Sequence, residues 1–75
     1  MKLKDRLLEQ FEMVDNDGQV GVYLYVIDYP KEPLYIVIGD TEEEFGWVLF
    51  TKEKEAKEFM EELKDSTDNI MDYFD

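Results

Sequence analysis

The sequence predicts an α+β fold in two layers, in which a three-stranded antiparallel meander sheet packs against an N-terminal and a long C-terminal helix (α-β-β-β-α). Apolar residues recur at helical spacing at both ends of the chain and alternate along three short central segments. The connections between these segments are short, which favours antiparallel neighbours. With 75 residues and no visible linker, the chain is expected to form one domain over residues 1–75.

The first segment, Lys2 to Val14, has the pattern of a short surface helix. Its apolar stripe consists of Leu3, Leu7, Phe11 and Val14. The following Asp15–Gly18 segment is expected to end the helix, because Asn, Asp and Gly tolerate turn conformations. This turn does not match an EF-hand loop, since Met13 and Leu24 would occupy the first and last ligand positions.

Three strands are predicted in the centre of the chain: Val20 to Asp28, Leu34 to Ile38 and Phe45 to Phe50. The prolines lie between the first two strands, where a missing N–H does no harm. Gly39 to Glu44 is a second turn. We expect Leu34 to Ile38 to be the middle strand of the meander.

Alternation predicts which residues of each strand share a face. In the first strand one face carries Val20, Val22, Leu24 and Val26, and we expect the helices to cover it. The opposite face would then carry an aromatic and aliphatic patch: Tyr23, Tyr25, Ile27, Tyr35 and Val37. Either Val48 and Phe50 or Phe45, Trp47 and Leu49 would join it, because both faces of the third strand are apolar. An exposed patch of this kind is typical of a partner or dimer contact, unless the first helix crosses to cover it.

The segment from Thr51 to Asp75 has the pattern of one amphipathic helix, with Thr51 as its N-cap. Its apolar stripe consists of Ala56, Phe59, Met60, Leu63, Thr67, Ile70, Met71 and Phe74. Residues of the Asp65–Asp68 segment favour caps over helix interiors, so a kink or restart is expected there.

A row of carboxylates lies opposite that apolar stripe. Its spacing of three and four residues places them within an arc of roughly 100° over ~25 Å of a continuous helix. Carboxylates near a helix C-terminus cost roughly 0.3–1 kcal/mol each, so stability alone does not explain them. The row consists of Glu58, Glu61, Asp65, Asp68, Asp72 and Asp75, and four further carboxylates lie in the second turn: Asp40, Glu42, Glu43 and Glu44.

Composition excludes several classes of function. The chain has neither Cys nor His, which removes the usual nucleophile, general base and soft metal ligands, so we predict no enzyme activity, cofactor or metal site. The net charge of −12 disfavours direct binding to nucleic acid or to an anionic membrane. No apolar run is long enough for a membrane span, and no signal-peptide core is present, so a cytoplasmic protein is expected.

In size, charge and lack of catalytic groups the chain resembles the small acidic proteins, many from phages and mobile elements, that mimic DNA and occupy the basic groove of DNA-binding enzymes. The resemblance is one of composition and carries no motif. It implies an inhibitor or antagonist, such as an anti-defence protein, that engages a basic surface of a nucleic-acid-handling protein through the carboxylates. The alternative is a structural or adaptor domain that dimerises or binds a protein through the tyrosine-rich sheet face.

Overall fold

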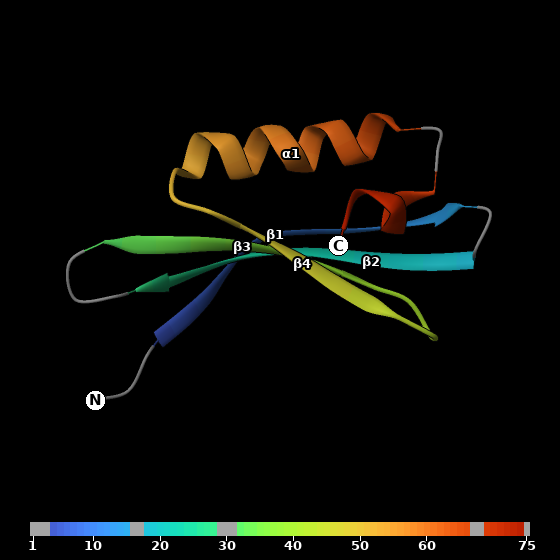
Figure 1. The fold of residues 1–75 in the computed structure, drawn as a ribbon, viewed down its shortest axis with the longest axis horizontal. Helices are drawn as coiled ribbons and strands as arrows, with labels where there is room; N and C mark the ends of the chain where they lie inside the picture. Colours follow the sequence, from blue (N-terminus) through green and yellow to red (C-terminus); the bar gives the residue numbers. More distant parts are fainter. Residues whose placement is uncertain (1–3, 16–17, 29–31, 67–68, 75) are drawn as a thin grey trace.

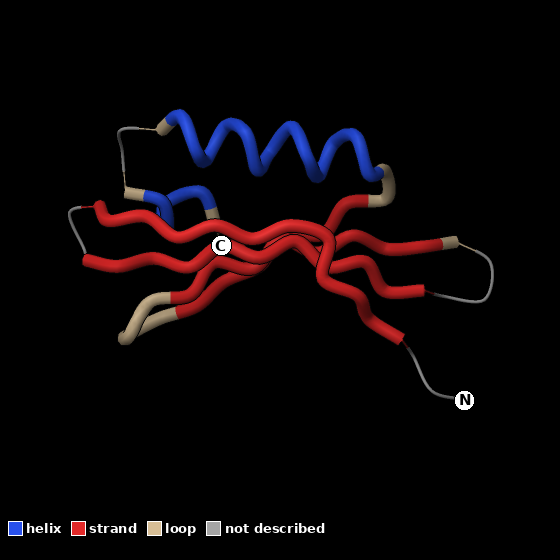
Figure 2. Tube along the Cα trace, turned by 180° about the vertical axis from the view of Figure 1, so that it is seen from behind, coloured by secondary structure: helices blue, strands red, loops and turns tan. Residues whose placement is uncertain are grey.

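The computed structural model describes residues 4–15, 18–28, 32–66 and 69–74. They form a four-stranded antiparallel sheet with one helix and a short 3-10 helix above it (Figure 1). No described element lies against the other face of the sheet (Figure 2). None of the described helices has the length and apolar composition needed to cross a membrane. In chain order the elements are β1 (Lys4–Asp15), β2 (Gly18–Asp28), β3 (Pro33–Asp40), β4 (Phe45–Phe50), α1 (Glu53–Asp65) and η1 (Ile70–Tyr73).

The expected N-terminal helix over Lys2 to Val14 is instead strand β1, so the predicted α-β-β-β-α order was wrong at its first element. β1 pairs antiparallel with β2 along its length, and the hairpin closes where Asp15 lies opposite Gly18. Gly18 has a φ angle of 106°, a conformation that glycine adopts without the steric penalty of a Cβ atom. The segment expected to end a helix therefore reverses a β-hairpin.

A β-bulge explains why β1 has the apolar spacing of a helix. The pairing register with β2 shifts between Leu7 and Glu9, which leaves Leu8 as the extra residue. Leu7 lies opposite Tyr25 on the uncovered face, whereas Leu8 and Phe11 pack against the core. The parity of the strand changes at the bulge, so the period-two pattern that identifies a strand in a sequence is lost.

The prediction of a long C-terminal helix was also wrong, because α1 ends at Asp65. Ser66 follows with an extended backbone (φ −73°, ψ 141°), and the next helical residues form the separate 3-10 helix η1. The expected break thus ends the helix, although Thr67 and Asp68 themselves lie outside the described residues. At its start, α1 has Lys52 rather than Thr51 at the N-cap position, with no capping side chain.

The core lies between the sheet and the helical layer. β2 contributes the predicted row of Val20, Val22, Leu24 and Val26, of which none is more than 2% exposed. Burial of each such side chain contributes ~1.5–3 kcal/mol, which is what holds α1 on the sheet. From the opposite side, α1 and η1 with the residue that follows contribute Ala56, Met60, Leu63, Ile70, Met71 and Phe74.

Two glycines let the C-terminal aromatic ring reach the sheet. A Cβ atom on Gly39 would stand 2.7 Å from the ring of Phe74, and one on Gly46 would stand 2.8 Å from the Cβ of Phe74. Gly39 and Gly46 lie opposite each other on β3 and β4, so they form a flat spot on the covered face. Phe74 then contacts Phe59 of α1 with ring centroids 5.7 Å apart, which ties η1 to the helix.

Candidate protein-binding surface

The face of the sheet away from α1 carries apolar rows on β2, β3 and β4, while β1 adds the polar residues Gln10 and Glu12 beside Leu7. No described element covers this face (Figures 1 and 2). Where all four strands run side by side, its most exposed apolar members lie on β4: Phe45 is 63%, Trp47 is 48% and Leu49 is 54% exposed. Val14 lies beyond that part, near the end of β1, and is 77% exposed. On the opposite edge Leu7 is 41% exposed, and the side chains between them are half-buried by their neighbours. We call this surface the open face, and its members are Leu7, Tyr23, Tyr25, Ile27, Leu34, Ile36, Ile38, Phe45, Trp47 and Leu49.

Cross-strand pairing arranges the open face in rows. Tyr25 of β2 lies opposite Ile36 of β3, which lies opposite Leu49 of β4. Strands lie ~4.8 Å apart and rise ~3.3 Å per residue, so the part in which all four strands run side by side measures roughly 19 by 20 Å. Gln10 and Glu12 of β1 and Asp40 of β3 also lie on this side, so the apolar patch occupies the part of that area formed by β2, β3 and β4.

The register decides the membership of the open face and corrects part of the prediction. Tyr23, Tyr25 and Ile27 lie on it as predicted. Tyr35 and Val37 do not, because Val37 pairs with Leu24 on the covered face and is fully buried. A shift of one residue in register moves every side chain of a strand to the other face, and the sequence does not fix that shift.

The same register settles the alternative left open for β4. Phe45, Trp47 and Leu49 lie on the open face, whereas Val48 and Phe50 pack against the core. The members that sequence reasoning missed were assigned to a helix or to the wrong side of the sheet: Leu7, Leu34, Ile36 and Ile38. Only the pairing of β2 with β3 and the bulge in β1 could have identified them, and neither has a clear sequence signal.

Carboxylates gather at one end of the open face, in the turn between β3 and β4. We call Glu42–Glu44 the acidic turn; all three residues are exposed. Thr41 holds the turn in shape, because its hydroxyl accepts hydrogen bonds from the backbone N–H groups of Glu43 (3.3 Å) and Glu44 (3.1 Å). The Thr41 backbone N–H donates to the Glu44 carbonyl at 2.9 Å. The predicted carboxylates Asp40, Glu42, Glu43 and Glu44 are therefore together on a built turn.

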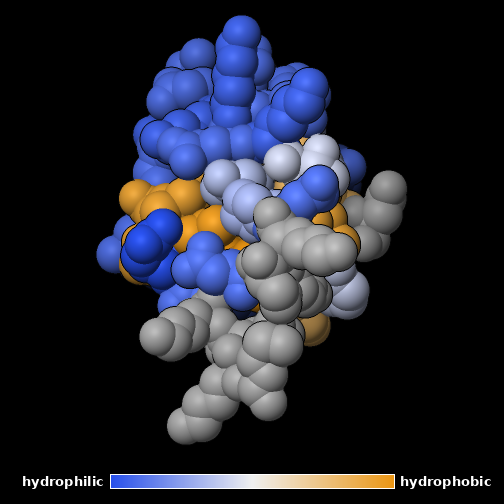
Figure 3. Space-filling model, turned by 90° about the vertical axis from the view of Figure 1, so that its left-hand side faces the viewer, coloured by the Kyte–Doolittle hydropathy of each residue, from blue (hydrophilic) through white to orange (hydrophobic). Residues whose placement is uncertain are grey.

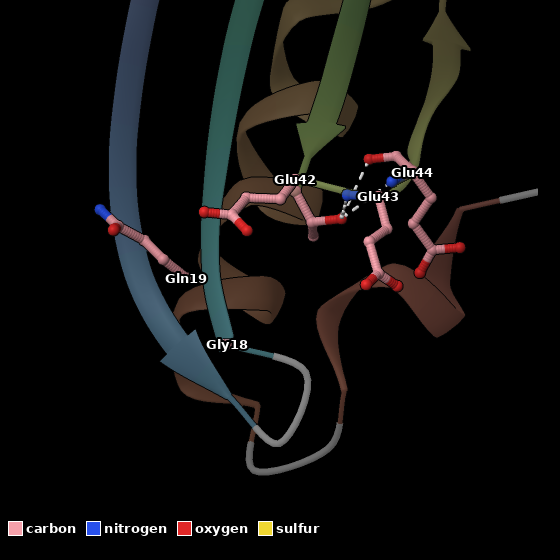
Figure 4. A pocket seen from close by; sticks show the side chains of 6 residues that line it. Gly18, Gln19, Glu42, Glu43 and Glu44 are labelled. Atoms are coloured by element: carbon pink, nitrogen blue, oxygen red, sulfur yellow. Dashed lines mark hydrogen bonds between the residues drawn. The ribbon is translucent and has the colours of Figure 1, made fainter.

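A shallow cleft separates this turn from the start of β2. It has a volume of about 460 Å³ and is lined by Gly18, Gln19, Thr41 and the acidic turn. Figure 4 shows the Glu42 side chain directed toward β2, while Glu43 and Glu44 extend away from it. A neighbouring cleft shares Gln19, Thr41 and Glu42 and adds Glu12, Gly21, Tyr23 and Asp40. Through Tyr23 the carboxylates adjoin the open face.

The carboxylate row expected on one continuous helix is interrupted. Glu58, Glu61 and Asp65 are exposed on α1, and Asp72 is exposed on η1. Asp68 and Asp75 lie outside the described residues. Figure 3 shows hydrophilic residues over the outer surface of α1 and hydrophobic residues below it at the level of the sheet.

Two lysines on α1 are engaged by carboxylates. Lys64 Nζ lies 2.9 Å from a carboxylate oxygen of Glu9 on β1, and 5.5 Å from the centre of the Phe11 ring. The hydrogen bond to Glu9 is the largest cause that raises the pKa of Lys64 above its ordinary value. Lys57 pairs with Glu53 at 2.8 Å, and that hydrogen bond likewise raises the pKa of Lys57. Both contacts lie on the side of the molecule that carries α1.

The described residues hold no group of three or more carboxylate or other ligating side chains that could bind a metal ion. Their arrangement favours contact with another molecule through apolar area and negative charge. No protein-family model matches the chain, and the searches of curated proteins and of solved structures found no match either.

Proposed function

We propose that this chain is a non-enzymatic protein-binding domain that holds a partner against its open face. The observation that carries the proposal is the apolar row on β4, where Phe45, Trp47 and Leu49 are each about half exposed or more. Contiguous exposed apolar surface beside polar surface is characteristic of protein contacts, and Trp and Tyr are favoured at their centres. Tyr23 and Tyr25 suit both the free and the bound state, since a tyrosine combines an apolar ring with a polar hydroxyl.

The charge of the surface indicates the chemistry of the partner. The acidic turn and Asp40 adjoin the open face at one end, and the whole chain carries a net charge of −12. Complementary potentials speed association and exclude partners of like charge. We therefore propose a partner that presents an apolar patch with Lys or Arg beside it.

The more specific role expected from the sequence, an inhibitor that mimics DNA, stays a prediction. Its argument from six carboxylates on one helix no longer applies, because α1 ends at Asp65. A basic surface on a nucleic-acid-handling protein remains compatible with the charge of the chain. The absence of enzyme activity and the cytoplasmic location also stay predictions.

The single tryptophan gives a direct test. Proteins captured from lysate at low salt would be purified and titrated into the chain while Trp47 emission is recorded. A partner that covers the open face should shift the emission to shorter wavelength, because the indole ring leaves water. Tyr25→Glu should weaken binding at least ~10-fold, since it places a charge in a desolvated contact. Reversing the charge of Glu42, Glu43 and Glu44 to Lys should weaken binding. It should also reduce the change of affinity with salt concentration.

A matched variant on the other side of the molecule distinguishes the alternative. Asp65→Lys with Asp72→Lys reverses the charge on the helical layer and leaves the open face unchanged. If this pair abolishes binding while Tyr25→Glu binds normally, the partner contacts the helical layer and the open-face proposal is wrong. Circular dichroism of each variant confirms that the fold is retained.

A further inference from the structure

The two edges of the sheet differ in how they are protected. β1 carries charges of both signs and a bulge between Leu7 and Glu9, which are two devices that prevent a strand edge from pairing with another chain. β4 has neither, since its six residues, Phe45–Phe50, include no charge and no proline and pair with β3 in unbroken register. In the described part of the chain, no strand lies beyond β4. Alternate N–H and C=O groups along that edge therefore point away from the sheet.

We infer that β4 pairs antiparallel with β4 of a second copy of this chain and forms a symmetric dimer with one continuous sheet. A two-fold axis perpendicular to the sheet keeps both open faces on the same side, so each open-face residue of one β4 lies opposite an open-face residue of the other. With the axis at Trp47, the two Trp47 residues face each other and Phe45 of each copy faces Leu49 of the other. All three exposed apolar side chains of β4 then gain a cross-strand neighbour.

Charge complementarity at the two ends of β4 favours this occupant. The acidic turn precedes β4, and Lys52 follows it. Antiparallel pairing brings the end of one copy beside the start of the other, so each Lys52 approaches the acidic turn of its partner. The contact occurs twice in the dimer. In parallel pairing each acidic turn would instead lie beside its counterpart, and like charges would repel.

The arrangement also closes at two copies. Each dimer uses both β4 edges, and the edges that remain are the charged and bulged β1 strands. Joining the two sheets doubles the width of the apolar surface, because the open faces are continuous across the pair.

Cross-linking tests the pairing directly, because the chain contains no cysteine. Trp47→Cys should form a disulfide-linked dimer under mild oxidation, since opposed Cα atoms in antiparallel strands are ~4.5–5.5 Å apart, within disulfide range. Val14→Cys on β1 is the control, because Val14 is 77% exposed against 48% for Trp47. If disulfides formed only by random collision, Val14→Cys would cross-link faster than Trp47→Cys. Faster cross-linking of Val14→Cys, or no cross-linked dimer of Trp47→Cys, would overturn the inference.

Charge exchange tests the antiparallel direction. Sedimentation over a concentration series that extends to millimolar should show a monomer–dimer equilibrium that added salt does not dissociate, since screening reduces the repulsion between two chains of charge −12. Lys52→Glu should weaken this dimer about tenfold, because the contact occurs twice. Adding Glu42→Lys and Glu44→Lys to that variant should restore it, which a loss of folding could not produce. A wild-type chain that stays monomeric throughout the series overturns the inference.

One further pair of variants separates the edge from the open face. Leu49→Lys and Leu7→Lys place the same charge on the open face at opposite edges. Only Leu49→Lys should block dimerisation. Equal loss in both would mean that two open faces stack on each other and that β4 does not pair. Partner binding is measured separately at chain concentrations below the dimer range, so failure of the dimer leaves the proposed function testable.

Discussion

Both faces of the sheet carry apolar rows on β2, β3 and β4, and they differ in what lies against them. On β3, Val37 is fully buried beneath α1, while its neighbour Ile36 on the open face is only half-buried. α1 has 13 residues and a length of ~20 Å, enough to cover one face of the sheet. The strands use much of the remaining chain, so no described segment covers the other face.

This difference shows that the composition of a strand does not reveal which of its faces is covered. β4 is apolar on both faces, yet Val48 packs against the core and Trp47 is 48% exposed. Burial follows from the position of α1, and that position follows from its apolar stripe. Three matched comparisons across the sheet, and one variant of an ion pair on the covered side, test this interpretation.

The largest effect is expected from the same truncation on the two faces. Leu24→Ala removes a fully buried side chain and should lower the free energy of unfolding by ~2–5 kcal/mol. Leu49→Ala removes a side chain that is 54% exposed and should cost less than ~1 kcal/mol. Urea denaturation of both variants measures the difference. Equal losses would mean that the open face is covered in solution.

The second comparison uses two tyrosines. Tyr35 packs against the core, so Tyr35→Glu should destabilise the domain by ~1–3 kcal/mol through the burial of a charge. Tyr25 lies on the open face, so Tyr25→Glu should lower the stability less than Tyr35→Glu does, although it weakens partner binding. Thermal melts of the two variants check the order. A more severe loss from Tyr25→Glu would place Tyr25 in a second core.

The third comparison adds one methyl group on each face. Gly39→Ala would set a Cβ atom 2.7 Å from the Phe74 ring, which is held by Phe59, and should cost ~1–3 kcal/mol. Gly21→Ala would set a Cβ atom 2.8 Å from the hydroxyl of Tyr23, on the open face. The Tyr23 ring can move toward solvent, so this variant should cost less. Chemical denaturation of both variants measures the two costs. A larger cost for Gly21→Ala would mean that the Phe74 ring moves aside more easily than the Tyr23 ring.

The smallest effect concerns the ion pair on the covered side. Lys64→Met retains the aliphatic stem and removes the contact with Glu9. Because the folded state raises the pKa of Lys64, its contribution is present at neutral pH and is lost as pH rises through that raised value. The melting temperature of Lys64→Met should therefore be slightly lower than wild type at neutral pH and equal to it in strong alkali. A difference that persists in alkali would assign the effect to packing on Phe11.

Local pattern in the sequence determined much of the central and C-terminal structure. The predicted strand Phe45 to Phe50 has the observed bounds, and the other two predicted strands lie within β2 and β3. The three pair antiparallel with β3 between β2 and β4. These features depend on neighbours in sequence: alternating apolar residues, short turns, and the helical stripe that buries Met60 and Leu63.

Only the tertiary structure decided the identity of β1, the membership of the open face and the end of the acidic row. Residues Lys4–Asp15 form a strand because β2 offers an edge of 11 residues to pair with, and strand preference depends on such partners. The open face follows from the register between β2 and β3, in which a shift of one residue reverses every side chain. The row of carboxylates ends with α1 because residues beyond Asp65 return to the sheet, where Phe74 packs over Gly39 and Gly46. Each of these outcomes depends on contacts between residues distant in sequence, which the local pattern does not contain.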